Sequence, residues 1–163
     1  MKIVSLTCKI IYISIFFCFQ FTNAVHSQTS KNYQIECISL ETDGYVKLAL
    51  WDTKLGEKYK PEQASKDAIY AILFAGVSGK SGCSLSPLLS NTKEKENFKN
   101  IEKSFFSRNG IWKNFTRSSV QGTNQNFEAQ EKKWMIVQIY VSKSELRKHL
   151  EDQKIIKRLN DGF

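Results

Sequence analysis

The alternation of apolar and polar positions in the first half of the chain predicts a β-hairpin. Residues 33–40 (YQIECISL) and 45–51 (YVKLALW) are rich in β-branched and aromatic side chains, as strands are. Asp43-Gly44 lies between them, and this pair tolerates the positive φ that a tight turn requires. Every other residue from 46 to 50 is aliphatic, so we expect this face of the second strand to point into the core.

The strongest strand pattern covers residues 133–141 (KWMIVQIYV), where alternation separates two sets of side chains. One set is Met135, Val137, Ile139 and Val141, and the other is Trp134, Ile136, Gln138 and Tyr140. If helices cover the first set alone, the second leaves an exposed apolar patch, which typically marks a partner site. We therefore predict a partner surface at Trp134, Ile136 and Tyr140, together with the loop 79–89, which we expect to have no internal structure.

Apolar residues with a helical period predict a helix over residues 62–77. It follows Pro61, which suits the first helical turn because an N–H at that position would have no partner. The inward face is expected to consist of Ala64, Ala68, Ile69, Ile72, Leu73 and Val77. Gly76 and Gly79 are both candidates to end this helix.

Capping boxes predict the starts of two more helices. Asn91 and Glu94 have the required spacing before a helix over residues 92–108, and Ser142 and Glu145 have it before a final helix. The inward residues are expected to be Phe98, Ile101 and Phe105 in the first of these, and Leu146 and Leu150 in the second.

The order of these elements favours an α+β fold. Residues 111–115 (IWKNF) are predicted to form either a short strand or an apolar loop, and residues 117–126 a polar connection. Strands and helices do not alternate regularly along the chain. This favours a largely antiparallel sheet, formed by the β-hairpin and one long strand, with helices packed on one face. Residues 28–163 suffice for one domain with its own core.

The first 27 residues have the three parts of an export signal. A positively charged start is followed by an apolar run over residues 10–19 and then by small residues that suit a signal peptidase. The run is too short for a spanning helix, which needs about 20 apolar residues. We expect cleavage after Ser27, or alternatively after Ala24. The sequence thus predicts a signal peptide, residues 1–27, and an exported protein, periplasmic or secreted, without a transmembrane segment in its mature part.

The chain has four cysteines, two of which lie in the predicted signal. Those two, Cys8 and Cys18, do not fit a lipid-attachment pattern, so no lipid anchor is expected. Cys37 and Cys83 remain in the mature part. In an oxidising compartment they permit one disulfide that closes a loop of about 45 residues. Two separate buried thiols are the favoured interpretation, because nothing in the sequence places the two Cα atoms within bonding range.

The charge pattern disfavours nucleic acid as a partner. The formal net charge of +8 falls to +6 when the two lysines of the predicted signal are removed. The remaining basic residues are spread along the chain with acidic residues between them. Nucleic-acid binding would favour arginines clustered with exposed aromatic residues on one face.

No cluster of residues predicts catalysis, a metal site or a cofactor site. Residues 76–82 contain glycines and a Lys-Ser pair, but they lack the spacing and the preceding strand of a phosphate-binding loop. The alternative is a secreted hydrolase that uses Cys83 or a carboxylate pair. Cys83 would need activation by His149, the one histidine after residue 27. The acidic candidates Glu62, Asp67, Glu94 and Glu96 are expected to be helix-surface or first-turn residues.

Five segments of the chain carry a resemblance to a known group of proteins. They are DGYVKLALW, ASKDAIYAILFAGVSG, SPLLS, FFSRNGIWKNFTR and VQIYVSKSELRKHLEDQKIIKRLNDGF. Together they resemble small exported proteins of Bacteroidetes-type bacteria, a functionally uncharacterised group, over nearly all of residues 44–163. This resemblance brings no catalytic residues with it.

The order of elements is also distantly similar to the small α+β domain of envelope lipoproteins and of curli-secretion and flagellar accessory proteins. That similarity implies assembly and binding rather than catalysis. The chain departs from these proteins because it has no suitable lipid-attachment cysteine. We therefore expect a non-catalytic protein of the bacterial envelope that binds another protein or a surface component.

Overall fold

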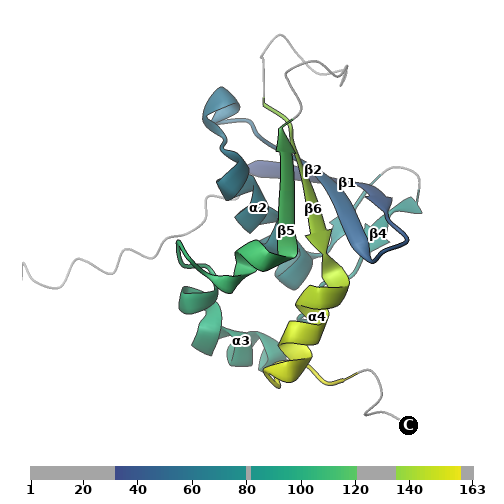
Figure 1. Cartoon of the computed structure of the whole chain (residues 1–163), viewed down its shortest axis with the longest axis vertical. Helices are drawn as coiled ribbons and strands as arrows, with labels where there is room; N and C mark the ends of the chain where they lie inside the picture. Colours follow the sequence, from purple (N-terminus) through teal and green to yellow (C-terminus); the bar gives the residue numbers. More distant parts are fainter. Residues whose placement is uncertain (1–31, 80–81, 121–134, 159–163) are drawn as a thin grey trace, which may run out of the picture. The chain divides into compact units, whose positions relative to one another are not determined.

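Figure 1 shows the computed structural model of the chain, which describes residues 32–79, 82–120 and 135–158. Within them, a four-stranded antiparallel sheet and a two-stranded ribbon combine with three α-helices. The elements in chain order are β1 (Tyr33–Leu40), β2 (Tyr45–Asp52), η1 (Gly56–Lys58), α2 (Pro61–Tyr70), η2 (Ala71–Ala75), β3 (Val77–Ser78), β4 (Ser84–Leu85), α3 (Thr92–Phe105), η4 (Ile111–Phe115), β5 (Thr116–Val120), β6 (Val137–Ser142) and α4 (Lys143–Asp152). The predicted α+β fold is confirmed. The predicted signal peptide, residues 1–27, and Trp134 lie outside the described residues.

The four-stranded sheet has the order β1-β2-β6-β5, and each neighbouring pair is antiparallel. Gly44, with a φ of +83°, lies in the turn between β1 and β2, where the Asp43-Gly44 pair predicted it. Leu48, in the middle of β2, pairs with Cys37 of β1 and with Ile139 of β6. All three of these side chains are buried, so the aliphatic face of β2 points into the core as predicted.

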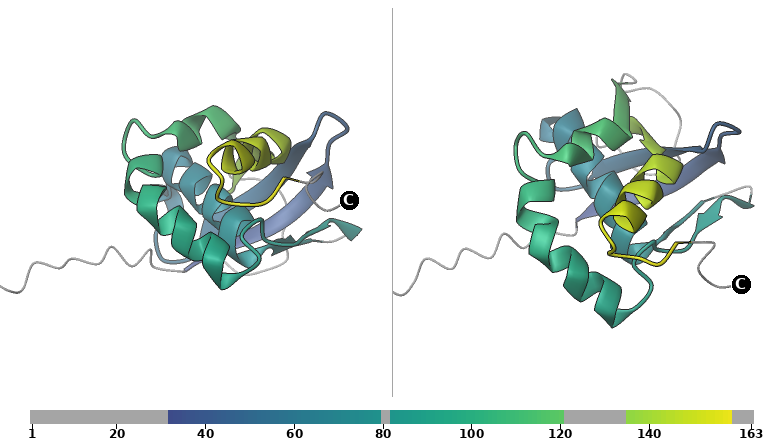
Figure 2. Two further views of the ribbon diagram at one scale, coloured as in Figure 1. Left: turned by 90° about the horizontal axis from the view of Figure 1, so that it is seen from below. Right: turned by 60° about the horizontal axis from the view of Figure 1, so that its bottom comes forward.

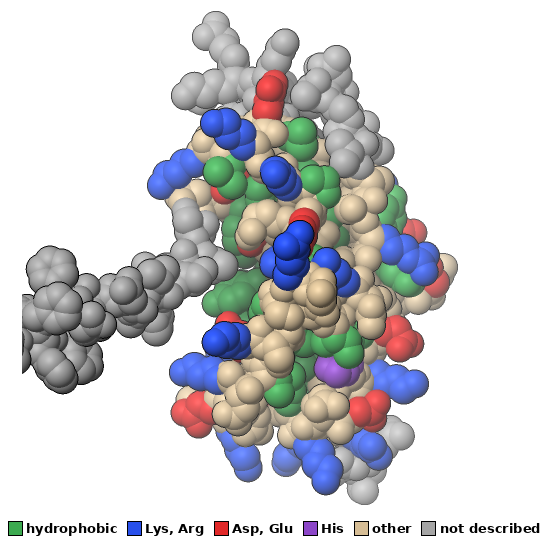
Figure 3. All heavy atoms as spheres, turned by 60° about the vertical axis from the view of Figure 1, so that its left-hand side comes forward, with side chains coloured by type: hydrophobic (Ala, Val, Ile, Leu, Met, Phe, Trp, Pro, Cys, Tyr) green, Lys and Arg blue, Asp and Glu red, His purple; other side chains and the backbone are tan. Residues whose placement is uncertain are grey.

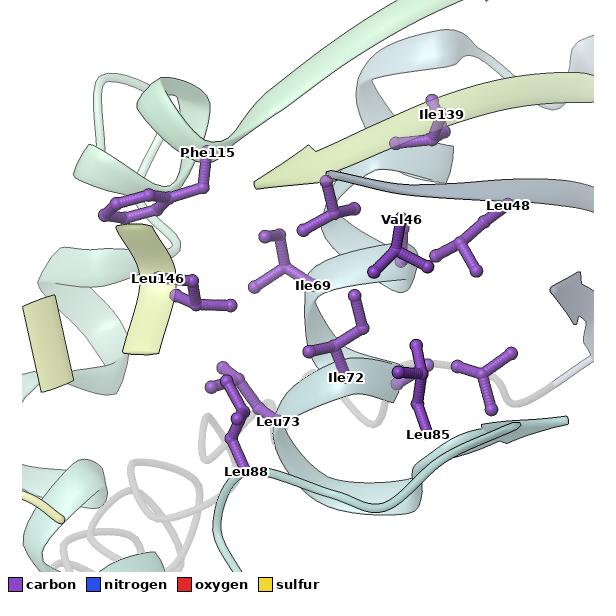
Figure 4. Packing of buried hydrophobic residues seen from close by; sticks show 14 of the residues in the cluster. Val46, Leu48, Ile69, Ile72, Leu73, Leu85, Leu88, Phe115, Ile139 and Leu146 are labelled. Carbon is purple, nitrogen blue, oxygen red and sulfur yellow. The ribbon is translucent and has the colours of Figure 1, made fainter. Parts of the chain in front are cut away.

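α2 lies on the inner face of the sheet, where it contacts β2, β5 and β6. The six residues predicted for the inward face are all buried: Ala64, Ala68, Ile69, Ile72, Leu73 and Val77. Figure 4 shows Ile69 and Ile72 beside Val46 and Leu48 of β2, with Ile139 of β6 above them. This contact between helix and sheet forms the centre of the core.

The helix that begins with α2 ends in one π-helical turn, η2. The Gly76 N–H donates to the Ala71 carbonyl, five residues back, at 2.8 Å. Gly76 then adopts a φ of +75°, which glycine allows at little cost and which ends the helix. The helix is therefore slightly shorter than predicted, and Val77 belongs to β3.

The loop 79–89 is more ordered in its described part than the sequence indicated. β4 pairs with β3, which contradicts the expectation of a loop without internal structure. Beyond β4, the N–H groups of Leu88 and Leu89 donate to the carbonyls of Ile72 and Leu73, both at 2.9 Å. These hydrogen bonds satisfy acceptors that the end of a helix leaves without intrahelical partners.

A disulfide joins Cys37 of β1 to Cys83, one residue before β4, with their Cα atoms 5.7 Å apart. Both cysteines are buried, and 46 positions separate them in the sequence. Beside this bond, Gly79 passes so close to β1 that a Cβ atom there would overlap the carbonyl oxygen of Cys37. The ribbon of β3 and β4 is thus held against β1 both covalently and by close backbone packing.

α3 begins with the predicted capping box. The Glu94 N–H donates to Asn91 Oδ1 at 3.0 Å, and the Asn91 N–H donates to Glu94 Oε2 at 3.3 Å. Phe98 faces inward and makes edge-to-face contacts with Phe74 of η2 and with Phe105, at centroid distances of 5.6 and 5.2 Å. Both views of Figure 2 accordingly show α3 alongside the helix formed by α2 and η2.

Three other local predictions are wrong. Residues 111–115 form a 3₁₀-helix, neither a strand nor a loop, because this turn buries both Trp112 and Phe115. Residues 116–120, assigned mostly to a polar connection, form the edge strand β5. Ser142 precedes α4, but its side chain makes no capping hydrogen bond. Leu146 and Leu150 do face inward as predicted, and both are fully buried.

We predict that loss of the disulfide lowers the free energy of unfolding by up to about 4 kcal/mol, because the bond restricts the unfolded chain. Urea unfolding of the wild-type protein with and without dithiothreitol measures this difference. A variant with both Cys37→Ala and Cys83→Ala should have the lower stability under both conditions. Equal stability of oxidised and reduced wild-type protein would contradict a structural role for this bond.

Candidate functional site

Four side chains from three strands lie together on the face of the sheet opposite α2, which we call the outer face. They are Tyr45 and Lys47 of β2, Tyr140 of β6 and Arg117 of β5. Cross-strand pairing sets their positions, because Tyr140 lies opposite Lys47 on one side and opposite Arg117 on the other. We call this group the outer-face cluster.

Each cation of the outer-face cluster lies over an aromatic ring. Lys47 Nζ is 5.5 Å from the centroid of the Tyr140 ring, and the Arg117 guanidinium carbon is 5.1 Å from that of Tyr45. Such contacts contribute about 0.5–1 kcal/mol at exposed sites. Arg117 is exposed and the other three side chains are half-buried, so the cluster is ordered and yet open to solvent.

The cluster lines a surface hollow of about 480 Å³. Glu41, Thr42 and Asp43 of the β1–β2 turn form the rest of its wall. Both turn carboxylates accept hydrogen bonds from nearby groups, Glu41 from the Ser39 hydroxyl at 2.5 Å and Asp43 from the Tyr45 N–H at 3.2 Å. The hollow therefore has acidic groups on the turn and basic groups on the strands.

The outer face is open near the β1–β2 turn and becomes buried farther along β2 and β6. Ala49 and Gln138 face each other across these strands and are both buried, at 2% and 8% exposure. Among the predicted partner residues, Tyr140 belongs to the outer-face cluster, whereas Ile136 lies just before β6 and is half-buried. Trp134 lies outside the described residues, and Cys83 of the loop 79–89 is bonded to Cys37 of β1.

Sequence reasoning identified Tyr140 but missed the other three members of the cluster. Tyr45 and Lys47 alternate with the aliphatic residues of β2, and this pattern already placed them on the face away from the core. Arg117 carried no such signal, because β5 was not recognised as a strand.

A buried polar group lies on the other side of the sheet, around Asp67 of α2. Tyr59 donates its hydroxyl hydrogen to Asp67 Oδ2 at 2.8 Å, and Gln63 donates to Oδ1 at 2.9 Å. Burial raises the pKa of Asp67 above its usual range, although these two hydrogen bonds favour its charged form. Burial, followed by the negative charge of Asp67, likewise raises the pKa of Tyr59.

Asp52, at the end of β2, is the second buried carboxylate near this group. Its Oδ1 accepts hydrogen bonds from the N–H groups of Lys54 and Leu55, both at 2.8 Å, and so stabilises the turn after β2. Its charge also contributes to the raised pKa of Asp67. Neither carboxylate lines the hollow of the outer-face cluster, and both have partners that give them structural roles.

The structure does not bring Cys83 and His149 together as a nucleophile and its base. The sulfur of Cys83 is bonded to Cys37. His149 lies on α4 against Phe105 and Phe115, with ring centroids 6.1 and 5.5 Å apart. His149 is half-buried, and this burial lowers its pKa.

A second hollow, of about 500 Å³, lies between the start of α3 and the end of α4. Its lining mixes acidic and basic side chains, and Arg158 pairs with Asp152 there at 3.7 Å. On the face shown in Figure 3, Lys and Arg side chains are similarly dispersed among acidic ones, without a single basic stripe.

The part of the chain that the structure describes contains no group of three or more His, Cys, Asp or Glu side chains arranged to hold a metal ion. It also contains no helix whose length and apolar character would allow it to cross a membrane.

No protein-family model, no curated protein and no solved structure matches this chain. The structure itself defines the class, an α+β protein with helices against one face of an antiparallel sheet.

We predict that Tyr59→Phe lowers the free energy of unfolding by about 1–3 kcal/mol, because it leaves a buried carboxylate oxygen without its donor. Tyr70→Phe is the matched control, since Tyr70 packs its ring against Phe74 and the change keeps that ring. The control should stay within about 0.5 kcal/mol of wild type. Chemical denaturation at neutral pH measures both, and equal values for the two variants would contradict the role given to the Tyr59 hydroxyl.

We predict that His149 makes the folded protein less stable as the pH falls below about 6.5. Its pKa is lowered by burial, so the unfolded chain takes up a proton on this residue before the folded protein does. The stabilising contribution is complete above that pH and is lost as the pH falls through the folded-state pKa. Urea unfolding from pH 7.5 to 4.5 should show a shallower decline for His149→Gln than for wild type; parallel curves would refute this.

Proposed function

We propose that this chain is an exported, non-catalytic protein that binds a component of the bacterial cell envelope through the outer face of its sheet. The outer-face cluster is the observation that carries the proposal. It gathers two tyrosine rings and two cations on the face that α2 leaves uncovered. Exposed aromatic side chains with polar groups at their edges are typical of surfaces that contact a partner.

The two faces of the sheet carry different kinds of side chain, and this difference supports the proposal. The inner face supplies the core residues Leu48, Leu50, Val137, Ile139 and Val141, all fully buried. Tyr45, Lys47, Arg117 and Tyr140 lie outside this core. Their aromatic and charged groups are therefore available to contact a ligand on the opposite face.

Two observations support an exported location. Residues 1–27 have the composition of a signal peptide. The disulfide between Cys37 and Cys83 is compatible with an oxidising compartment such as the periplasm or the extracellular space. The cations of the outer-face cluster favour an envelope component that exposes anionic groups.

A secreted hydrolase is less well supported than a binding protein. The sulfur of Cys83 is committed to a disulfide, which leaves no thiol at that position to act as a nucleophile. Asp67 and Asp52 are buried beside hydrogen-bond donors and do not line the outer-face hollow. The arrangement around them is that of a structural network.

We predict that replacing both Tyr45 and Tyr140 with alanine weakens binding to isolated envelopes of a Bacteroidetes-type bacterium by about tenfold or more. Co-sedimentation of the purified, labelled protein over a range of envelope concentrations measures the affinity. The matched control combines Leu55→Ala with Ile111→Ala, two exposed apolar residues that do not line the hollow.

The control variant should bind as the wild type does, and both variants should unfold at a similar urea concentration. Wild-type protein that does not sediment with envelopes would refute the proposal. The same conclusion follows if the tyrosine variant binds as tightly as wild type.

A further inference from the structure

We infer that the outer-face cluster recognises one isolated anionic group, a carboxylate or a phosphate, which Lys47 and Arg117 hold while the rest of the ligand packs on the rings of Tyr45 and Tyr140. This inference rests on the proposed function and names the chemistry of its ligand. The class of ligand is therefore a small anionic group attached to an apolar or ring-containing body.

Lys47 and Arg117 are held in position without a carboxylate that neutralises their charge. Among the described residues, ion pairs join Lys113 to Glu62, Arg147 to Glu151 and Arg158 to Asp152. Neither Lys47 nor Arg117 takes part in an ion pair within that part of the chain. Instead, the tyrosine rings hold them, so an incoming anion meets ordered positive charges without first displacing a carboxylate.

Lys47 and Arg117 lie on strands that are separated by one other strand. Lys47, Tyr140 and Arg117 form one row across β2, β6 and β5. Neighbouring strands lie about 4.8 Å apart, so the backbones of Lys47 and Arg117 are about 10 Å apart, with Tyr140 between them. The Arg117 guanidinium lies over the ring of Tyr45, a residue of β2, and Lys47 Nζ lies over the ring of Tyr140, on the strand between them. Two long side chains can therefore contact the same anion.

The acidic side chains of the β1–β2 turn limit the size of the anion that the hollow accepts. Glu41 and Asp43 line the same hollow and place negative charge on the adjacent turn. These carboxylates repel a chain of closely spaced phosphates but tolerate a single anionic group on the strand side of the hollow. This disfavours nucleic acid and favours an isolated charge.

The volume and the lining of the hollow suit a ligand with an apolar or ring-containing body. The hollow volume of about 480 Å³ falls within the range typical of small-molecule sites. The rings of Tyr45 and Tyr140 form part of its wall and offer apolar surface for stacking. An anion without such a body would use the cations alone.

The test is a titration of the purified protein, followed by the chemical shifts of its backbone amides, with phenyl phosphate and with benzoate. We expect at least one probe to shift the resonances of residues 45, 47, 117 and 140 in a saturable manner. Lys47→Ala and Arg117→Ala should each weaken that binding by about tenfold, as expected when one of two charge-assisted contacts is lost. Lys113→Ala is the matched control, because Lys113 also lies over an aromatic ring, that of Trp112, but does not line the hollow.

The relative affinities of the two probes distinguish a carboxylate from a phosphate ligand. The inference is overturned if neither probe binds, if neutral benzyl alcohol binds as tightly as the anionic probes, or if the two cation variants bind as wild type does. Tighter binding of a long polyphosphate than of phenyl phosphate would also overturn it. Envelope binding that needs the tyrosines but is unchanged in both cation variants would retain the proposed function and reject this inference.

Discussion

Ile69 of α2 and Ile72 of η2 pack against Val46 and Leu48 of β2, and this contact decides which face of the sheet becomes the interior. Each such aliphatic side chain contributes about 1.5–3 kcal/mol when it is fully buried. Because strand residues alternate between faces, burial of one set directs the intervening residues to the opposite face. The location of the outer-face cluster is thus a consequence of where α2 lies, and a shift of one residue in the register of β2 would remove both the core and the cluster.

The end of the same helix fixes the ribbon beside the sheet. The π-helical turn η2 is followed by Gly76 with its positive φ, and the carbonyls of Ile72 and Leu73 within η2 accept hydrogen bonds from Leu88 and Leu89. The disulfide then connects this region back to β1. A segment with many small residues is thereby held in place by its surroundings rather than by its own hydrophobic content, which is why its composition alone suggested an unstructured loop.

Features that depend on residues close in sequence could be predicted, and features that depend on distant pairing could not. The β1–β2 turn, the inward face of α2 and the capping box of α3 all follow from local signals, and each is present. β5 was missed because TRSSV is polar at nearly every position and so lacks the apolar alternation that marks a half-buried strand. The same reason hid the candidate site, since Arg117 reaches Tyr45 only after β6 has aligned their strands.

The order of strands in the sheet also constrains when the protein can fold. Among the strands in the described residues, β6 comes last in sequence, yet it occupies a central position between β2 and β5. During synthesis, the earlier strands emerge first and lack the neighbour that would join them into one sheet. Until residue 142 has left the ribosome, β5 has no partner strand and the helices have an incomplete surface to cover. A nascent chain with this topology therefore cannot complete its four-stranded sheet before β6 has emerged.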